Sequence, residues 1–476
     1  MPRQVNIGIV TLSLALLAGC SQVGDYQRPS STIPDKWQKS KLPEGALKAT
    51  QLDWRTFFQD ARLQTLITST LNHNNDLRIA LARVEETRAQ YRVTSADRTP
   101  SVNASGTRTK SKIPAAFTGT DQPTTTERNE FSLTAVSFEL DFWGRVANMS
   151  EAAKASFLAS ESASRAMRIT LIAQVADLYF TALELDERLI ITRAAVESRR
   201  RNRDIIQRGV QLGAAARSDL LMAESAYYST QSELASLEND LAANEHAMQL
   251  LVGKPPGELP QGRRLHEQEV RNDLAPGIPS EVIYARPDVI AAELRLKEAH
   301  ANVGAARAAF LPRLLLTAAM GFASPSLAKL FAPVSGNWAF QPAMSLPIFD
   351  NGRTAGAEGV AEARKNSAVA DYERVIQQAF REIADLLSSR AALIDQRQAT
   401  ESMLKAYEER LHVMEVRFKS GSASLIEVLD AQRDLYFAQQ SAVQIRRKQL
   451  VASSQLYKAL GGGDSLKQEA SDKKSG

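Results

Sequence analysis

The 476-residue sequence predicts a mixed fold, an internally duplicated chain of long helices interrupted by two pairs of β-strands. Three observations carry this prediction. Motifs recur at a nearly constant offset along the chain. Long segments rich in strong helix formers contain neither glycine nor proline. Between them lie shorter runs in which apolar and small or polar residues alternate, as in strands.

The duplication is clearest where motifs follow the same order twice. Gly144 in FWGR corresponds to Gly352 in FDNGR, 208 residues later, and LLVG and KALG are separated by the same distance. The segments that end at Pro100 and Pro312 are 212 residues apart. The second copy is therefore four residues shorter between its proline and its glycine, which marks a variable loop.

Each copy is expected to hold one very long helix and one shorter helix. The segments without glycine or proline are 145–208, 214–252, 360–420 and 422–460. A helix over the first segment would reach ~96 Å at ~1.5 Å per residue, which favours coiled coils or long struts over a globular packing. Gly213 and Gly421 interrupt the helices at equivalent places, so we expect them to form turns between antiparallel partners.

Two β-hairpins are expected, at about 101–140 and 313–348. Their strands are predicted at 101–110, 129–140, 313–322 and 337–349. In the last strand Trp338, Phe340, Pro342, Met344, Leu346 and Ile348 alternate with small or polar residues, which gives one apolar face. About ten residues per strand suits a tilted membrane strand, but a soluble four-stranded sheet that caps the helices fits the pattern as well.

Four strands are too few to close a barrel, and an open sheet edge cannot lie in lipid. If the hairpins enter a membrane, several chains must therefore share one barrel.

The N-terminus reads as an export signal. Arg3 precedes a short apolar run over 9–18, and no run of 18 apolar residues is present, so we expect no membrane-spanning helix. Leu17-Ala18-Gly19-Cys20 resembles the bacterial lipobox, in which the signal peptidase cleaves before the cysteine and the thiol carries a lipid. Ser21 rather than Asp follows, and in lipoproteins this implies sorting to the outer membrane.

Composition argues against several other classes. The net charge is +4, and the densest basic runs, 198–203 and 446–448, lie in helical patterns with acids nearby. We therefore interpret them as solvated helix faces rather than a nucleic-acid site. One cysteine and five dispersed histidines make a metal centre or disulfide unexpected. The sequence contains no G-x-S-x-G, H-E-x-x-H, C-x-x-C or P-loop, so we expect no enzyme and no cofactor beyond a lipid on Cys20.

Seven ordered motifs, which cover roughly residues 20 to 463, together resemble the outer-membrane factors, the TolC-like exit ducts of tripartite efflux pumps. The resemblance is to the lipoprotein branch that includes OprM. The motifs are GCSQVGDYQRP, ELDFWGR, GIPSEVIYARPDVIAAE, NVGAARAAFLP, LPIFDNGR, VLDAQR and YKALGGG.

The resemblance implies a homotrimer in the outer membrane that extends into the periplasm. Each chain would give four strands to one twelve-stranded barrel, continued by a tunnel of long helices and girdled by an equatorial domain. The partners would be a periplasmic adaptor and an inner-membrane transporter, usually of the resistance-nodulation-division class, which supplies the energy. The expected function is a passive exit duct for drugs and other small toxic compounds, with an iris-like periplasmic gate.

The resemblance also assigns site residues. Glu427 and Asp430 match gate positions, Ile426 matches an apolar constriction, and Arg433 lies on the same helix face. Gly213 and Gly421 are the expected adaptor-docking turns. Three like charges around a trimer axis would repel by about 1 to 4 kcal/mol per pair, which Arg433 or cations could offset.

The repeat offset relates the gate to the first copy, pairing Glu427 with Asp219, Asp430 with Met222 and Arg433 with Ser225. The two copies therefore differ in charge, which suggests different roles for the inner and outer helix pairs.

Alternatives remain at this level. One alternative is a duct of the same fold that serves metal-ion or protein export. Another is a periplasmic coiled-coil adaptor lipoprotein, which also has long helices but forms only one helical hairpin. The domains expected are a signal peptide (1–19), a lipidated equatorial segment (20–55), repeat 1 (56–253), an equatorial linker (254–285), repeat 2 (286–462) and a disordered tail (463–476).

Overall fold

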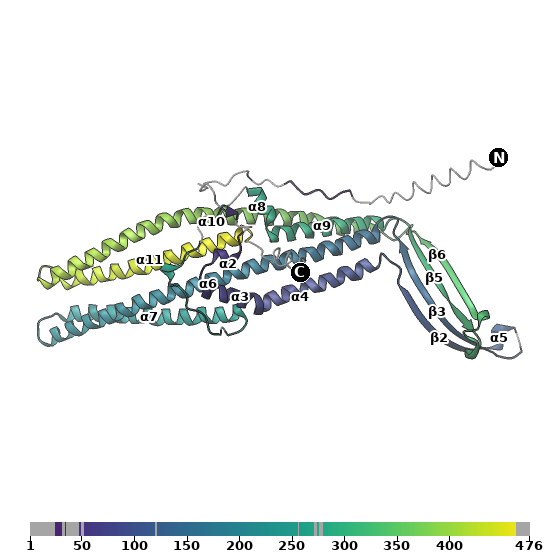
Figure 1. Ribbon diagram of the computed structural model, residues 1–476, viewed down its shortest axis with the longest axis horizontal. Coiled ribbons are helices and arrows are strands. Elements are labelled where there is room, and N and C mark those ends of the chain that lie inside the picture. Colours follow the sequence, from purple (N-terminus) through teal and green to yellow (C-terminus); the bar gives the residue numbers. More distant parts are fainter. Residues whose placement is uncertain are drawn as a thin grey trace. The chain divides into compact units, whose positions relative to one another are not determined.

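Figure 1 presents a computed structural model of the chain. The structure describes residues 24–30, 34, 47–48, 52–119, 121–255, 257–270, 274–275 and 279–462. The expected signal peptide, Cys20 and the tail 463–476 lie outside these residues.

The chain divides into two compact units, which are described separately. Unit 1 comprises Met1–Ser31, Ala82–Glu161 and Ile290–Arg374, and unit 2 comprises Thr32–Leu81, Ser162–Val289 and Val375–Gly476. Four long helices begin in one unit and end in the other, so each unit contains segments of both copies of the repeat.

The duplication predicted from the sequence is present in the order and length of the elements. The first copy contains α4 (Asn75–Ala96), β2 (Val102–Ile113), β3 (Thr124–Leu140), α6 (Arg145–Gln211) and α7 (Arg217–Val252). The second copy contains α9 (Pro287–Ala308), β5 (Arg313–Ser324), β6 (Gly336–Ser345), α10 (Arg353–Lys419) and α11 (Leu425–Ala459). Helices α4 and α9 both have 22 residues, and α6 and α10 both have 67.

The offsets agree as well. Helix α9 begins 212 residues after α4, whereas α10 and α11 begin 208 residues after α6 and α7. The remaining elements are β1 (Leu47–Lys48), α2 (Trp54–Phe57), α3 (Ala61–His73), α5 (Ala115–Thr118), β4 (Leu274–Ala275), α8 (Pro279–Ala285) and the 3-10 turns Leu265–Glu267, Leu327–Lys329 and Pro333–Ser335.

Unit 1 contains the predicted sheet, a four-stranded antiparallel sheet in the order β2-β3-β5-β6 (Figure 1). Within the described chain, β2 and β6 each pair on one side only. A bulge between Ala135 and Phe138 interrupts the β3–β5 ladder, and Ser137 there has a φ of 53°. The side chains of β2 and β6 are exposed almost throughout, so both edges of this sheet are available to partners.

Two strand boundaries differ from the prediction. Strand β3 begins at Thr124, inside the expected polar loop, because the threonine-rich segment continues the β2 ladder to the pair Ile113 and Thr124. Strand β6 ends at Ser345, so Leu346 and Ile348 lie beyond it. Ser345 pairs with Arg313, the first residue of β5, and no strand remains there to pair with the residues that follow.

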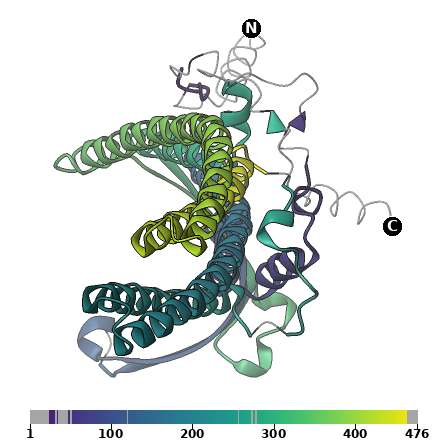
Figure 2. The same ribbon diagram turned by 90° about the vertical axis from the view of Figure 1, so that its left-hand side faces the viewer.

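Unit 2 contains the turns and a helical core. Segments of α6 and α7 pack through Leu185, Leu189 and Leu237, and the same pair packs again nearer the turn through Ile206 and Leu220. Figure 2 shows this pair beside the α10–α11 pair, both seen from the ends that carry the turns. Leucine spacing on helices that lie antiparallel is the pattern expected of coiled coils.

A second core of unit 2 packs the C-terminal end of α11 against the segment around α2. The ring of Phe57 stacks on Tyr457 of α11 at 4.5 Å, and the Tyr457 hydroxyl donates to the Leu52 carbonyl at 2.8 Å. Asp60 caps α3 and is almost fully buried. Its carboxylate also accepts hydrogen bonds from Tyr179 and Gln268, which compensate for the lost contact with water. These contacts join the segment before α3, the 254–285 region and the long helices.

The expectation that no helix could span a membrane needs one correction. By length and composition alone, α6 contains an 18-residue window that is apolar enough, with a mean hydropathy of 1.2. The window is 44% buried inside the protein, and packed helices of this kind meet the same criterion. The window is not an uninterrupted apolar run, so the sequence pattern did not reveal it.

Candidate functional site

The two predicted turns close the α6–α7 and α10–α11 pairs at the same end of unit 2 (Figures 1 and 2). Gly213 and Gly421 have φ angles of +72° and +73°, the left-handed region where only glycine is unstrained. The following residue donates back across the turn in each case, at 2.8 Å from Ala214 to Gly209 and from Ser422 to Arg417. A Cβ atom added at either glycine would meet no described atom within 4 Å beyond its chain neighbours, so both turns face outward.

Helix α11 begins with a capping box that uses one predicted gate residue. Ser424 is the N-cap, and its hydroxyl accepts from the Glu427 backbone N–H at 3.4 Å. The Glu427 carboxylate accepts from the Ser424 N–H at 2.7 Å and from its hydroxyl at 2.9 Å. These bonds, the backbone one first, lower the pKa of the Glu427 carboxyl. Within the protomer Glu427 is therefore turned toward the helix start.

Asp430 and Arg433 are brought together as predicted by their spacing. Arg433 pairs with Asp430 at 3.1 Å and with Asp434 at 3.0 Å, and Asp434 also pairs with Arg410 of α10 at 2.6 Å. Burial opposes ionisation of Asp434, but the bonds from Arg433 and Arg410 outweigh it and lower the pKa of that carboxyl. Two acids and two arginines thus form one neutral chain that ties α11 to α10.

A groove of about 680 Å³ runs between α7 and α11. Asp430 and Arg433 line it from α11, and their repeat equivalents Met222 and Ser225 line it from α7. The groove therefore follows the internal duplication at these positions, which are charged in the second copy and uncharged in the first. Arg188 and Arg199 of α6 and Glu233 of α7 line it as well. Ile426, half exposed at 50%, precedes the groove in the first turn of α11.

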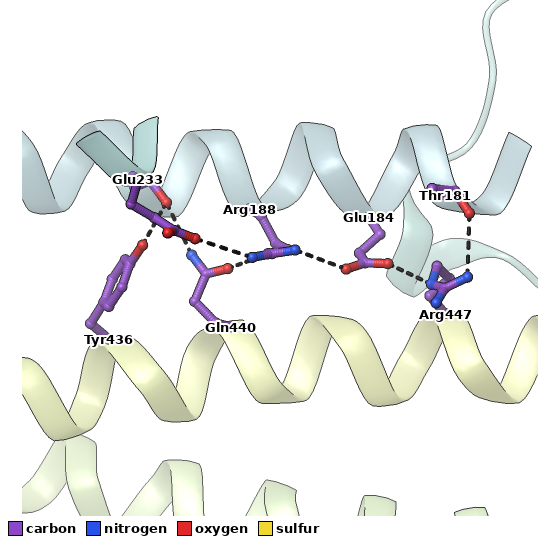
Figure 3. Close-up of polar contacts among 8 residues, drawn as sticks. Thr181, Glu184, Arg188, Glu233, Tyr436, Gln440 and Arg447 are labelled. Atoms are coloured by element: carbon purple, nitrogen blue, oxygen red, sulfur yellow. Dashed lines mark hydrogen bonds and ion pairs between the residues drawn. The ribbon is translucent and has the colours of Figure 1, made fainter. Parts of the chain in front are cut away.

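A second polar network joins α6, α7 and α11 farther along the helices (Figure 3). Arg188 of α6 lies at its centre and contacts Gln440 at 2.5 Å, Glu184 at 3.3 Å and Glu233 of α7 at 3.4 Å. Glu184, whose side chain is 7% exposed, also pairs with Arg447 of α11 at 2.5 Å. Arg188 and Glu184 therefore connect one helix pair to the other through largely buried side chains.

The network continues toward the turns through hydroxyl and amide groups and then through Arg199. The Thr192 and Tyr436 hydroxyls lie 2.9 Å apart, and Gln440 donates to Thr192 at 3.1 Å. Arg199 lies over the Tyr436 ring at 5.5 Å and donates to Thr230 of α7 and the Ala226 carbonyl.

The sequence interpretation missed this network and was wrong about part of its basic runs. Arg199 and Arg203 of the first run, and Arg446 and Arg447 of the second, are half-buried rather than solvated. Arg203 lies over the Tyr227 ring, and Arg446 donates to the Gln268 carbonyl. The sequence signal was weak: these arginines lie within three residues of apolar positions on the same helix. Helix packing decides which arginines turn inward.

Unit 1 holds the residues that follow the predicted lipidation site. Arg28 forms a bidentate pair with Glu293 of α9, at 2.8 Å and 3.2 Å. His300 lies 3.0 Å from the Gly24 carbonyl, and Lys297 lies 5.1 Å from the Tyr26 ring. Burial, followed by the charge of Glu293, raises the pKa of Tyr26 to about 12. Cys20 lies outside the described residues, four positions before this strap of residues 24–30.

The described residues contain no group of three or more His, Cys, Asp or Glu side chains placed to hold a metal ion. The arrangement provides two outward turns, a groove and two polar networks that cross between helices.

Comparison with known proteins gives a consistent result over nearly the whole chain. Residues 66–254 and 278–462 match the profile of a family described as outer membrane efflux protein. The chain is 37% identical over 451 residues to the cation efflux system protein CusC of Escherichia coli K12, covering 94% of this chain and 97% of CusC. It is 35% identical over 474 residues to the outer membrane protein OprJ of Pseudomonas aeruginosa, covering 97% of each.

A solved structure extends the similarity to the fold. The open state of the Neisseria gonorrhoeae MtrE outer membrane channel superposes with a TM-score of 0.85 at 32% identity, covering 93% of this chain and 98% of MtrE.

Proposed function

The chain belongs to the outer membrane efflux protein family, and we propose that three copies form the outer-membrane duct through which a tripartite pump discharges small toxic compounds. Its role is that of a channel, as in the relatives, and the driving energy comes from an inner-membrane transporter. A periplasmic adaptor connects the two.

The open sheet carries the proposal. Its edge strands β2 and β6 pair on one side only within the described chain, and unpaired backbone groups cannot lie in lipid. Three copies of a four-stranded sheet, joined β6 to β2, close into a barrel of twelve strands without an edge. The fold therefore requires partners in the membrane, and identical chains supply them by threefold symmetry.

The helix contacts support a gate of which α11 is the moving part. Helix α11 is held to α10 through Asp434 and to α6 through Glu184 and Gln440. Such contacts are discrete, so breaking them releases the helix from its neighbours rather than bending it gradually. We assign gating to Ile426, Glu427, Asp430 and Arg433, which lie between the turn and these contacts.

Asp430→Ala tests this assignment. Loss of the Asp430 carboxylate frees Arg433 from one of its two acidic partners and removes a negative charge from the groove, so conductance and ion selectivity should change. Single-channel recording on purified trimers measures both, with Asp240→Ala as the control, an exposed acid of α7 outside the groove. Equal records from the two variants would contradict the assignment.

We assign adaptor docking to the turns at Gly213 and Gly421, because both face outward at the same end of the helix pairs. Gly421→Val forces a β-branched side chain into a left-handed φ, so the turn must change shape. Drug resistance should fall while trimers remain in the membrane. Gly257→Val, outside both turns, is the control, and full resistance in Gly421→Val cells would refute the docking role.

Small organic compounds are the cargo that the groove favours. Both acids that line the groove are paired, Asp430 with Arg433 at 3.1 Å and Glu233 with Arg188 at 3.4 Å. Met222 and the exposed Phe437 line the same groove. A wall of paired charges and apolar side chains does not select cations as an unpaired acidic ring does.

A deletion strain tests the cargo. It should become sensitive to antibiotics, dyes and detergents, and a plasmid copy should restore growth. CusC is named for cation efflux, so copper and silver salts belong in the same panel. Sensitivity restricted to the metal salts would replace the organic cargo with cations.

A further inference from the structure

The two faces of the sheet in unit 1 differ sharply in polarity. Strand register assigns each side chain to a face, because neighbours directly opposite one another point the same way. One face, here called the apolar face, carries Phe131, Leu133, Met320, Phe322, Trp338 and Phe340. The other carries Ser105, Ser132, Thr134, Asn337 and Gln341. The apolar face is the one that suits lipid, and the polar face suits a water-filled lumen.

The apolar face ends in a cluster of aromatic rings. The last apolar row across the sheet is Gly106, Phe131 and Phe322. Phe331, from the loop between β5 and β6, packs on both rings of that row, at 5.9 Å from Phe131 and 5.5 Å from Phe322. Aromatic rings at the end of an apolar band mark the boundary between hydrocarbon and headgroups in membrane barrels.

Positive charge follows directly beyond this boundary on the same face. The β2–β3 hairpin extends past β5, which ends at Ser324. Along β2 the face continues from Gly106 with Arg108, Lys110 and Lys112, here called the cationic tip. All three side chains are exposed.

The acids nearby do not balance this charge. On the apolar face the opposite strand offers Glu127 alone, which pairs with Arg108 at 2.7 Å. Lys110 and Lys112 thus leave an excess of two positive charges on this face. The polar face at the same rows carries Arg128 and Glu130, which pair with each other at 3.1 Å. The excess is confined to the side that faces lipid.

We propose that the cationic tip binds the phosphate groups of lipid headgroups in the leaflet that the hairpin tips reach. The proposal rests on the membrane insertion proposed above. Lys110 lies four residues beyond Gly106, ~13 Å along a strand at ~3.3 Å per residue. With a strand tilt of ~40° this is ~10 Å above the last apolar row, which is headgroup depth.

Lipid is favoured over a protein partner because the three features are continuous. A lipid molecule that covers Trp338 and Phe131 with its acyl chains places its phosphates beside Lys110 without leaving the surface. A protein partner outside the membrane could contact the cationic tip, but it would not account for the apolar band that continues from the tip into the hydrocarbon.

The test uses purified full-length trimers in neutral detergent, titrated with bisphosphorylated lipid A and with the same lipid after removal of its phosphates. Each lysine near an anionic surface contributes about fivefold in affinity, so Lys110→Gln with Lys112→Gln should weaken binding of the phosphorylated lipid about twenty-five-fold. The charge-retaining pair Lys110→Arg with Lys112→Arg should bind within about twofold of wild type. Arg128→Gln, on the polar face of the same hairpin, is the matched control and should not change binding.

Two results would overturn the proposal. One is equal binding of phosphorylated and phosphate-free lipid by the wild type, and the other is wild-type affinity in the double glutamine variant, as expected if the cations serve a protein instead. Conductance of the same trimers in phosphatidylcholine bilayers separates this failure from that of the duct. Conducting trimers without phosphate preference refute the lipid site alone, whereas wild-type protein that neither inserts nor conducts refutes both.

Discussion

Glu184→Gln is the most informative single change in the network that joins the two helix pairs. The carboxylate is 7% exposed and holds two arginines from different helices, Arg188 of α6 and Arg447 of α11. Removing one partner of a fully buried ion pair costs about 3 to 5 kcal/mol.

Here the cost is smaller because both arginines keep other partners. Arg447 retains Asp177 at 3.5 Å, and Arg188 retains Glu233 and Gln440. Their side chains are also 27% and 17% exposed, so water screens part of the loss. We expect about 2 kcal/mol per protomer, which increases the population in which α11 has left α6 about thirtyfold.

Distances across the groove measure that population. Spin labels at Ser229 of α7 and Ser441 of α11 lie on its two walls. With labelled protomers diluted by unlabelled ones, a longer second distance should appear in Glu184→Gln trimers. Glu238→Gln is the matched control, since Glu238 pairs with Arg193 at 3.0 Å with both side chains more than half exposed, and exposed pairs contribute little. If the two variants give the same distance distribution as the wild type, the network does not hold α11 in place.

Three further predictions concern other parts of the chain. Ser424→Ala removes the N-cap hydroxyl of α11, so hydrogen exchange of the first-turn amides should be about fivefold faster, while exchange in α7, which begins without a side-chain cap, stays unchanged. Arg433 and Arg410 lower the pKa of Asp434, so its contribution to holding α11 against α10 is complete above the ordinary value of 3.8 and is lost as the pH falls through the lowered pKa. Spin labels on α10 and α11 should therefore show an acid-induced widening in that range, which should be absent in Asp434→Asn. Cys20→Ser behind a cleavable signal should still give inserted, conducting trimers in reduced amount, and complete loss from the membrane fraction would show that the lipid rather than the barrel provides the attachment.

The duplication, the helices and the hairpins could be predicted from the sequence because they depend on local signals. Glycine and proline end regular structure wherever they stand, so Gly213 and Gly421 indicated both turns. Alternation in the last strand identified the apolar face from Trp338 to Met344, because side-chain direction in a strand follows from position alone. The family relation rested on motifs in order, which needs no structure either.

Packing decided what the side chains contact. Glu427 and Asp430 share a spacing that sequence reads as one face, yet Glu427 caps its own helix and Asp430 joins Arg433. The arginines near 199 and 447 resembled solvated charges, and only the approach of α6 to α11 turned them inward onto Tyr436 and Glu184. Sequence spacing fixes which residues share a helix face, whereas a salt bridge between helices depends on which faces meet and on how much water remains between them.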